Sequence, residues 1–164
     1  MAASMTVHVD HNPFLDGRAP ARITIDWVSH TDGVVSLKIC STLSAANLRA
    51  AGNNAQGSLE IDKIRGTLHK IETIPGLYNG YLAPVIGDTP ALPTDLYDIT
   101  LLDPYGLDVA DGTLVNRSGT LPEVVVFSGG KYIVDSEITV TIANAGDSKK
   151  GRIIIDLLES EDRP

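Results

Sequence analysis

Three side chains near the start of the chain, His8, Asp10 and His11, are of types that bind metal ions. Imidazole nitrogen and carboxylate oxygen together suit zinc or nickel. However, residues i and i+3 of an extended segment face opposite ways, so His8 and His11 would not share one ion. We therefore predict no metal site in this segment.

A second group, Asp103, Asp108 and Asp111 followed by Gly112, resembles a calcium-binding loop in composition. The spacing does not fit an EF-hand, and no glutamate stands at the twelfth position. Aspartate is also a common turn former, because its side chain accepts hydrogen bonds from nearby backbone amides. The pattern favours aspartates that shape turns over a calcium site.

No set of residues fits a phosphate loop or a catalytic triad. After Gly129–Lys131 a phosphate loop requires Ser or Thr, but Tyr132 follows, and Val125 stands where the first glycine belongs. His30 and His69 have no serine or cysteine placed beside them by the sequence. We therefore predict no catalytic residues, no cofactor and no enzymatic activity.

Composition narrows the class of protein further. The chain has 164 residues, 43% of them hydrophobic and 21% charged, which is typical of one globular domain. Its 15 glycines and 9 prolines predict many turns between short elements. A net charge of -8 argues against nucleic acid and anionic membranes as partners, and a single cysteine cannot form an internal disulfide.

Targeting signals are also missing from the sequence as given. It contains no apolar run of membrane-spanning length, and residues 1–5 lack the basic region and apolar core of a secretory signal. We therefore expect synthesis in a cytoplasm.

The elements are strands, because apolar residues alternate with polar ones. Residues 137–143 and 151–157 show this pattern around the polar connector 144–150, which predicts a hairpin. Residues 22–28 and 35–39, joined through Asp32-Gly33, predict a second hairpin with Trp27 in the core.

Further strands are predicted over 59–64, 67–74 and 96–102, and residues 124–127, apolar on both faces, read as a central strand. Residues 107–115 fit either a short helical turn or a hairpin arm, and 44–51 allows one or two helical turns. Many short strands without a long helix predict an all-β protein, an antiparallel β-sandwich or jelly roll. This domain is predicted over residues 22–164.

Two segments are predicted to make contacts with other subunits. Residues 1–21 read as an extended N-terminal arm, and residues 75–93, with four prolines and three glycines, as a long loop. The loop is rich in apolar side chains, which suit either an interface or packing on the protein's own core. The predicted contact residues are Pro13, Phe14, Leu15, Leu77, Tyr78, Tyr81, Leu82, Val85 and Ile86.

One stretch resembles a known class of proteins. Residues 94–109, TDLYDITLLDPYGLDV, followed by Asn116-Arg117-Ser118, are similar to small structural proteins of tailed-bacteriophage virions. Residues 26–29, 66–76 and 142–146 have counterparts there, so the resemblance extends over about residues 22–158. The loop from Tyr78 to Pro90 departs from the pattern.

The resemblance implies a β-rich capsid decoration (cement) protein or another accessory virion component, assembled as a symmetric oligomer. The expected partners are the major capsid protein and further copies of the chain, as a trimer, in a virion made in a bacterial cytoplasm. Two alternatives remain open. The chain could lie at the head-tail junction or in the tail, or it could be a β-sandwich that binds host glycans through Tyr78 and Tyr81.

Overall fold

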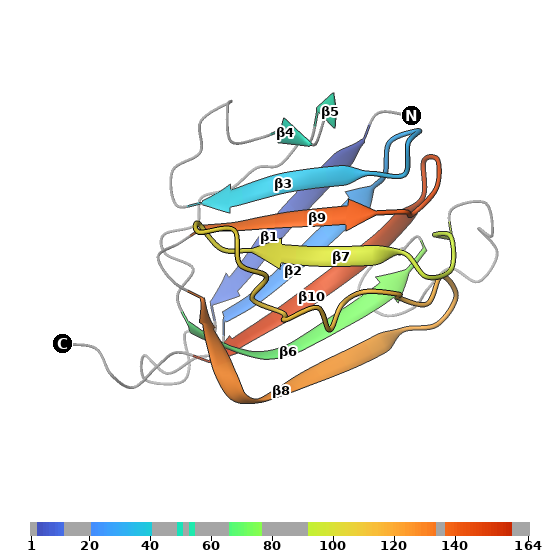
Figure 1. Ribbon diagram of the computed structural model, residues 1–164. Helices are drawn as coiled ribbons and strands as arrows, with labels where there is room; N and C mark the ends of the chain where they lie inside the picture. The colour runs from blue at the N-terminus through green and yellow to red at the C-terminus, as the bar shows by residue number, and fades with distance from the viewer. Residues whose placement is uncertain are drawn as a thin grey trace.

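Alternating apolar residues form two antiparallel sheets that pack face to face (Figure 1). The structure, a computed structural model, describes residues 3–11, 21–40, 49–50, 53–54, 66–76, 92–133 and 137–158. In these ranges all regular elements are strands, which confirms the predicted all-β sandwich. They are β1 (Ser4–His11), β2 (Ala21–Val28), β3 (Val35–Cys40), β4 (Arg49–Ala50), β5 (Asn53–Asn54), β6 (Gly66–Pro75), β7 (Asp98–Leu102), β8 (Glu123–Ile133), β9 (Glu137–Ala143) and β10 (Lys150–Leu158).

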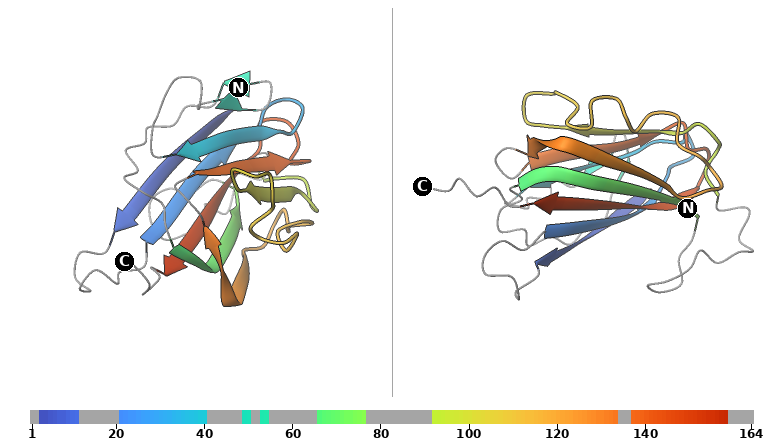
Figure 2. Two further views of the ribbon diagram at one scale, coloured as in Figure 1. Left: turned by 60° about the vertical axis from the view of Figure 1, so that its left-hand side comes forward. Right: turned by 90° about the horizontal axis from the view of Figure 1, so that it is seen from below.

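The larger sheet has the strand order β1-β2-β10-β6-β8, the smaller one β3-β9-β7, and β4 and β5 form a short pair. Within the described ranges no helix is long and apolar enough to cross a membrane. In the pairs β2 and β3, β6 and β7, and β9 and β10, consecutive strands belong to opposite sheets, and Figure 2 shows the two sheets facing each other. This alternation between two facing antiparallel sheets is that of a β-sandwich.

Both predicted hairpins are therefore wrong. The strand pairs β2/β3 and β9/β10 are consecutive in sequence, but their members belong to different sheets. Instead β2 pairs with β10, Ile25 opposite Ile153, and β3 pairs with β9, Leu37 opposite Val140. The alternation of apolar residues correctly gives the face that each strand buries, but it does not specify the neighbouring strand.

Residues 103–122 take the place of a further strand beside β7. The amide of Val109 donates to the carbonyl of Leu101 (2.8 Å), and the amide of Arg117 donates to the carbonyl of Tyr97 (2.7 Å). Between these two contacts the chain makes turns, in which the amides of Asp111 and Thr113 donate to carbonyls three residues earlier, so the segment holds short turns and isolated bridges in place of a continuous strand. It covers the β7 edge and leads from the smaller sheet to β8 (Figure 1).

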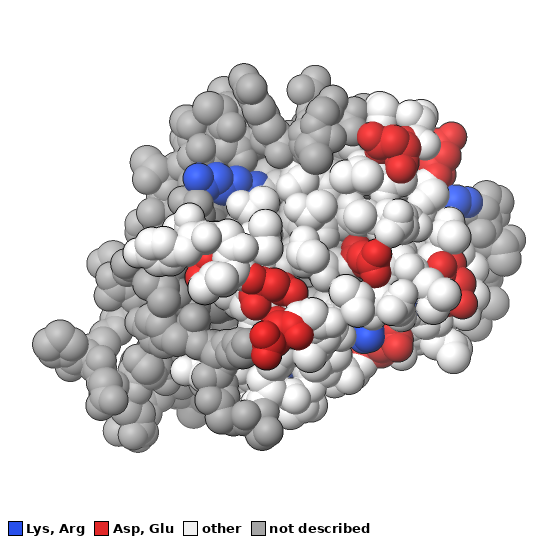
Figure 3. Space-filling model, viewed as in Figure 1, with Lys and Arg blue, Asp and Glu red and all other residues white. Residues whose placement is uncertain are grey.

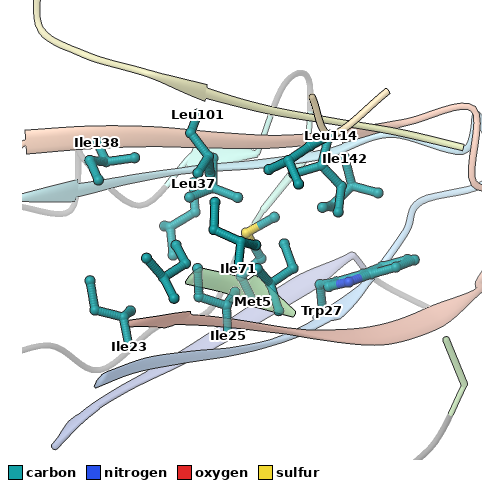
Figure 4. Packing of buried hydrophobic residues seen from close by; sticks show 14 of the residues in the cluster. Met5, Ile23, Ile25, Trp27, Leu37, Ile71, Leu101, Leu114, Ile138 and Ile142 are labelled. Carbon is teal, nitrogen blue, oxygen red and sulfur yellow. The ribbon is translucent and has the colours of Figure 1, made fainter. Parts of the chain in front are cut away.

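The core lies between the two sheets, and its residues are those that the alternation predicts. Figure 4 shows Ile23, Ile25 and Trp27 of β2 facing side chains of the smaller sheet. The buried residues include Met5, Ile23, Ile25, Trp27, Leu37, Ile71, Tyr97, Ile99, Leu101, Leu114, Ile138, Val140, Ile142, Ile153, Ile155 and Leu157. Trp27 and Tyr97 meet across the core with ring centroids 5.7 Å apart.

The inter-sheet connections are hydrogen-bonded to one another. Ser29 is fully buried, and its hydroxyl donates to the carbonyl of Gly146 (2.5 Å) and accepts from the amide of Lys149 (2.9 Å). The amide of Ala145 donates to the carbonyl of Gly33 (3.1 Å). We call residues 29–34 and 144–149 together the turn stack.

The described ends of the connection from β6 to β7 bond to the start of β10 and to the turn stack. Gly76 donates its amide to the carbonyl of Lys150, and Thr94 donates its amide to that of Ala145, each at 2.8 Å. The turn stack and the described ends of this connection therefore lie at one hydrogen-bonded end of the sandwich.

Charges on the outer face of the larger sheet are paired. Asp156 accepts from Arg22 Nε (2.7 Å) and lies 3.4 Å from Lys70 Nζ, while Arg152 and Asp26 form a bidentate pair at 2.6 and 2.9 Å. Burial alone would raise the pKa of Asp156, but hydrogen bonds and charges from Arg22 and Lys70 outweigh it and lower the pKa. The carboxylate is thus held in its ionised form.

We expect Asp156→Asn to lower the free energy of unfolding by about 1 kcal/mol at pH 7, since Arg22 and Lys70 are partly exposed and screened. Because the folded pKa lies below the unfolded one, this contribution is complete above the unfolded pKa and is lost as the pH falls through the folded one. Urea titrations should therefore give a difference between wild type and variant that shrinks below about pH 4. Asp147→Asn, at an exposed position, is the control for loss of charge. A difference that persists unchanged at pH 3 would contradict this assignment.

Candidate interaction surface

The contact residues predicted from the sequence, Pro13, Phe14, Leu15, Leu77, Tyr78, Tyr81, Leu82, Val85 and Ile86, lie outside the described residues. The predicted arm over residues 1–21 needs a correction for its first part. Ser4–His11 is β1, paired with β2 at one edge of the larger sheet, with Met5 opposite Trp27. Met5 and Val7 are buried, so the alternation of apolar residues in this segment was the signal for a strand.

The aspartates that resemble a calcium loop form turns, as the sequence favoured. Asp103 Oδ1 accepts from the amides of Tyr105 and Leu107, each at 2.9 Å. Asp108 accepts from the amides of Leu101 (3.3 Å), Ala110 (3.0 Å) and Gly112 (2.8 Å). Over the ranges that the structure describes, no three His, Cys, Asp or Glu residues are grouped to hold a metal ion.

Other carboxylates fix the remainder of this segment. Asp98 accepts from the amide of Asn116 (2.9 Å), and Asp95 accepts from that of Gly119 (3.0 Å). Glu123 accepts from the amide of Ser118 (2.6 Å). The segment lacks a continuous ladder of strand hydrogen bonds, and these carboxylates supply the partners that its backbone amides need.

This fixed segment carries large apolar side chains into solvent. Tyr105, in the turn after β7, is 81% exposed. Further exposed apolar residues lie along the same stretch of chain, before β7 and in the connection to β8. We call the following set the acidic-apolar flank: Leu96, Tyr105, Leu107, Val115 and Leu121.

The flank is also strongly acidic. Residues 92–123 contain six acidic residues and a single basic one, Arg117. Figure 3 shows the acidic side chains spread over this face, with few basic ones among the described residues. The outer face of the larger sheet differs, because there Arg22, Lys70 and Arg152 compensate the acids. The charge and the exposed apolar area together favour a partner surface that is basic and has apolar recesses.

Strand β8 adds a second exposed apolar area. Val124 and Val126 point outward and are 53% and 64% exposed, while Val125 and Phe127 pack against the core. The sequence predicted residues 124–127 as a central strand, which is wrong. Strand β8 is the last strand of the larger sheet, and only β6 pairs with it among the described strands.

The chain was also compared with known proteins. No family model, no curated protein and no solved structure matches it.

Proposed function

We propose that this protein is a structural component of a tailed-bacteriophage virion and binds the capsid exterior as a decoration protein. The observation that carries the proposal is the acidic-apolar flank, whose apolar side chains are exposed on a backbone fixed by carboxylates. A prearranged apolar surface suits adhesion, because little conformational freedom is lost on binding. The resemblance of residues 94–109 to virion proteins gives the context.

The fold agrees with this proposal by analogy alone. Antiparallel folds of two facing sheets occur in viral capsid proteins, but also in lectins and cupins, so the fold does not specify a function. The flank is the more specific argument. Its partner would be the major capsid protein, and repeated weak contacts over a symmetric shell would give high avidity.

The test is cosedimentation of the purified chain with shells assembled from the major capsid protein. We expect binding in proportion to the capsid protein, and at least a tenfold loss of affinity for the double variant Tyr105→Ala, Leu107→Ala, since buried aromatic anchors dominate interfaces. Ile154→Ala, an apolar loss on the outer face of the larger sheet, is the control. Unchanged binding of the double variant would contradict the role of the flank.

Copy number in isolated particles separates decoration from the head-tail alternative. A decoration protein scales with the major capsid protein, whereas a junction or tail protein is present in a few copies on one axis.

Glycan binding is a second candidate, favoured by the exposed ring of Tyr105, because a solvent-facing aromatic ring can stack on a sugar. Binding to an array of host-surface glycans, lost in Tyr105→Ala, would support it. Silence of the array would remove it.

A further inference from the structure

The edge of β8 is chemically unusual for a strand that ends a sheet. Its charged residues are Glu123 and Lys131; between Val124 and Phe127 it has no charged residue and no proline, and Val124 and Val126 expose apolar surface on its outer face. Sheet edges usually carry charges, prolines or a covering segment, because an apolar edge invites pairing with another strand. The stretch from Val124 to Phe127 lacks charges and proline, which favours a pairing partner there.

The other sheet edges differ from β8. Residues 108–117 cover the edge at β7, and β4 lies against β3. At the far end of the larger sheet, β1 alternates its apolar residues with the polar residues Ser4, Thr6, His8 and Asp10, whereas residues 124–127 of β8 are all apolar. Among the described strands, β8 thus has the apolar edge most open to pairing.

We propose that β8 is a homodimer contact, in which the β8 strands of two copies pair antiparallel about a two-fold axis at Val125. The two larger sheets would then continue into one. In this register Val124 lies opposite Val126 of the second copy, and Glu123 lies opposite Phe127 of the second copy. Pairing adds main-chain hydrogen bonds and covers the exposed valines on the outer face.

Charge supports this register. On β6, Glu72 lies opposite Val124 and Lys70 lies opposite Val126. With the axis at Val125, the order across the contact is Glu72, Val124, then Val126 and Lys70 of the second copy. Each pair of valines is therefore flanked by opposite charges.

The neighbouring two-fold registers lack this complementarity. An axis at Val124 would place Glu72 of both copies in one row, and an axis at Val126 would do the same for Lys70. A register displaced by a single residue would set an outward-facing side chain against an inward-facing one, which a continuous sheet does not allow. The axis at Val125 is thus the favoured arrangement.

The proposal does not depend on capsid binding. It gives a dimer, whereas the resemblance to virion proteins leads to the expectation of a trimer. Size-exclusion chromatography coupled to light scattering measures the molar mass in solution. We expect this mass to rise from that of a monomer to that of a dimer as the protein concentration increases. A mass that stays monomeric at all concentrations, or a trimer, would overturn the contact.

Val126→Asp places one negative charge on each copy beside the two-fold axis. It should raise the dimer dissociation constant at least tenfold. Because Val126 is 64% exposed, the variant should keep its fold, which the urea midpoint verifies. Leu107→Asp, on the acidic-apolar flank, is the matched control and should leave the dimer intact. The same two variants separate the proposals, since Val126→Asp should retain contact with single capsid sites and Leu107→Asp should lose it. An undiminished dimer in Val126→Asp would overturn the inference.

Cysteine pairs test the register itself. In a Cys40→Ser background, which removes the single native cysteine, Val124→Cys and Val126→Cys chains are mixed and oxidised. Val124 and the opposite Val126 of the second copy would lie about 5 Å apart, within the range of a disulfide. Val124 of one copy and Val124 of the other would be offset by two residues along the strands and lie about 8 Å apart. The mixture should form cross-linked dimers, and each variant alone should not. Cross-linking of either variant alone at the same rate would contradict the axis at Val125.

Discussion

Replacing Gly151 with alanine is expected to lower the free energy of unfolding by about 3 kcal/mol, because the new methyl group would overlap the indole of Trp27. A Cβ atom on Gly151 would lie 2.5 Å from Cζ2 and 2.7 Å from Cε2 of that ring. The ring has little room to move, since Trp27 is 1% exposed and packs on Tyr97. Urea unfolding followed by tryptophan fluorescence measures the loss.

The control for this prediction is a double-mutant cycle with Trp27→Phe. Phenylalanine lacks the second ring of the indole, so Gly151→Ala should cost less in that background than in the wild type. Circular dichroism follows unfolding in the variants without tryptophan. Equal costs in both backgrounds would show that the overlap with Trp27 is not the cause.

Replacing Gly33 with alanine should lower the free energy of unfolding by roughly 1 kcal/mol or more beyond the loss caused by the same change at Gly112. Both glycines have positive φ angles, +80° and +72°, which alanine tolerates poorly. They differ in their surroundings. A Cβ atom on Gly33 would lie 2.8 Å from the backbone nitrogen of Gly146, whereas nothing lies within 4 Å of one on Gly112.

Comparison of the two variants separates backbone strain from the close approach in the turn stack. Unfolding in urea gives the free energy for each, and the difference between them reports the contact between Gly33 and Gly146. If both substitutions cost the same, the turn stack tolerates a methyl group and its packing contributes little.

The faces of the strands could be predicted from the sequence, but their neighbours could not. Ile138, Val140 and Ile142 alternate with polar residues and are buried as expected. Asp32-Gly33, by contrast, suits a hairpin turn and an inter-sheet connection equally well, because both need a positive φ angle at glycine. The choice between them depends on β9 and β10, which lie more than 100 residues further along the chain.

The candidate site could be predicted only in part. The turn at Asp103–Gly106 was evident from its residues, but the exposure of Tyr105 depends on what the rest of the chain covers. Strand β8 shows the same limit. Its apolar residues 124–127 predict burial on both faces, and the fold places them at an edge, where burial of the outer face requires a partner.

The position of β10 has a consequence for how the protein forms. Residues 150–158 lie between β2 and β6, in the middle of the larger sheet. During synthesis on the ribosome, β2 and β6 emerge before β10. Neither strand can pair with β10 until residues 150–158 have been added. The larger sheet therefore cannot be completed before β10 has been synthesised.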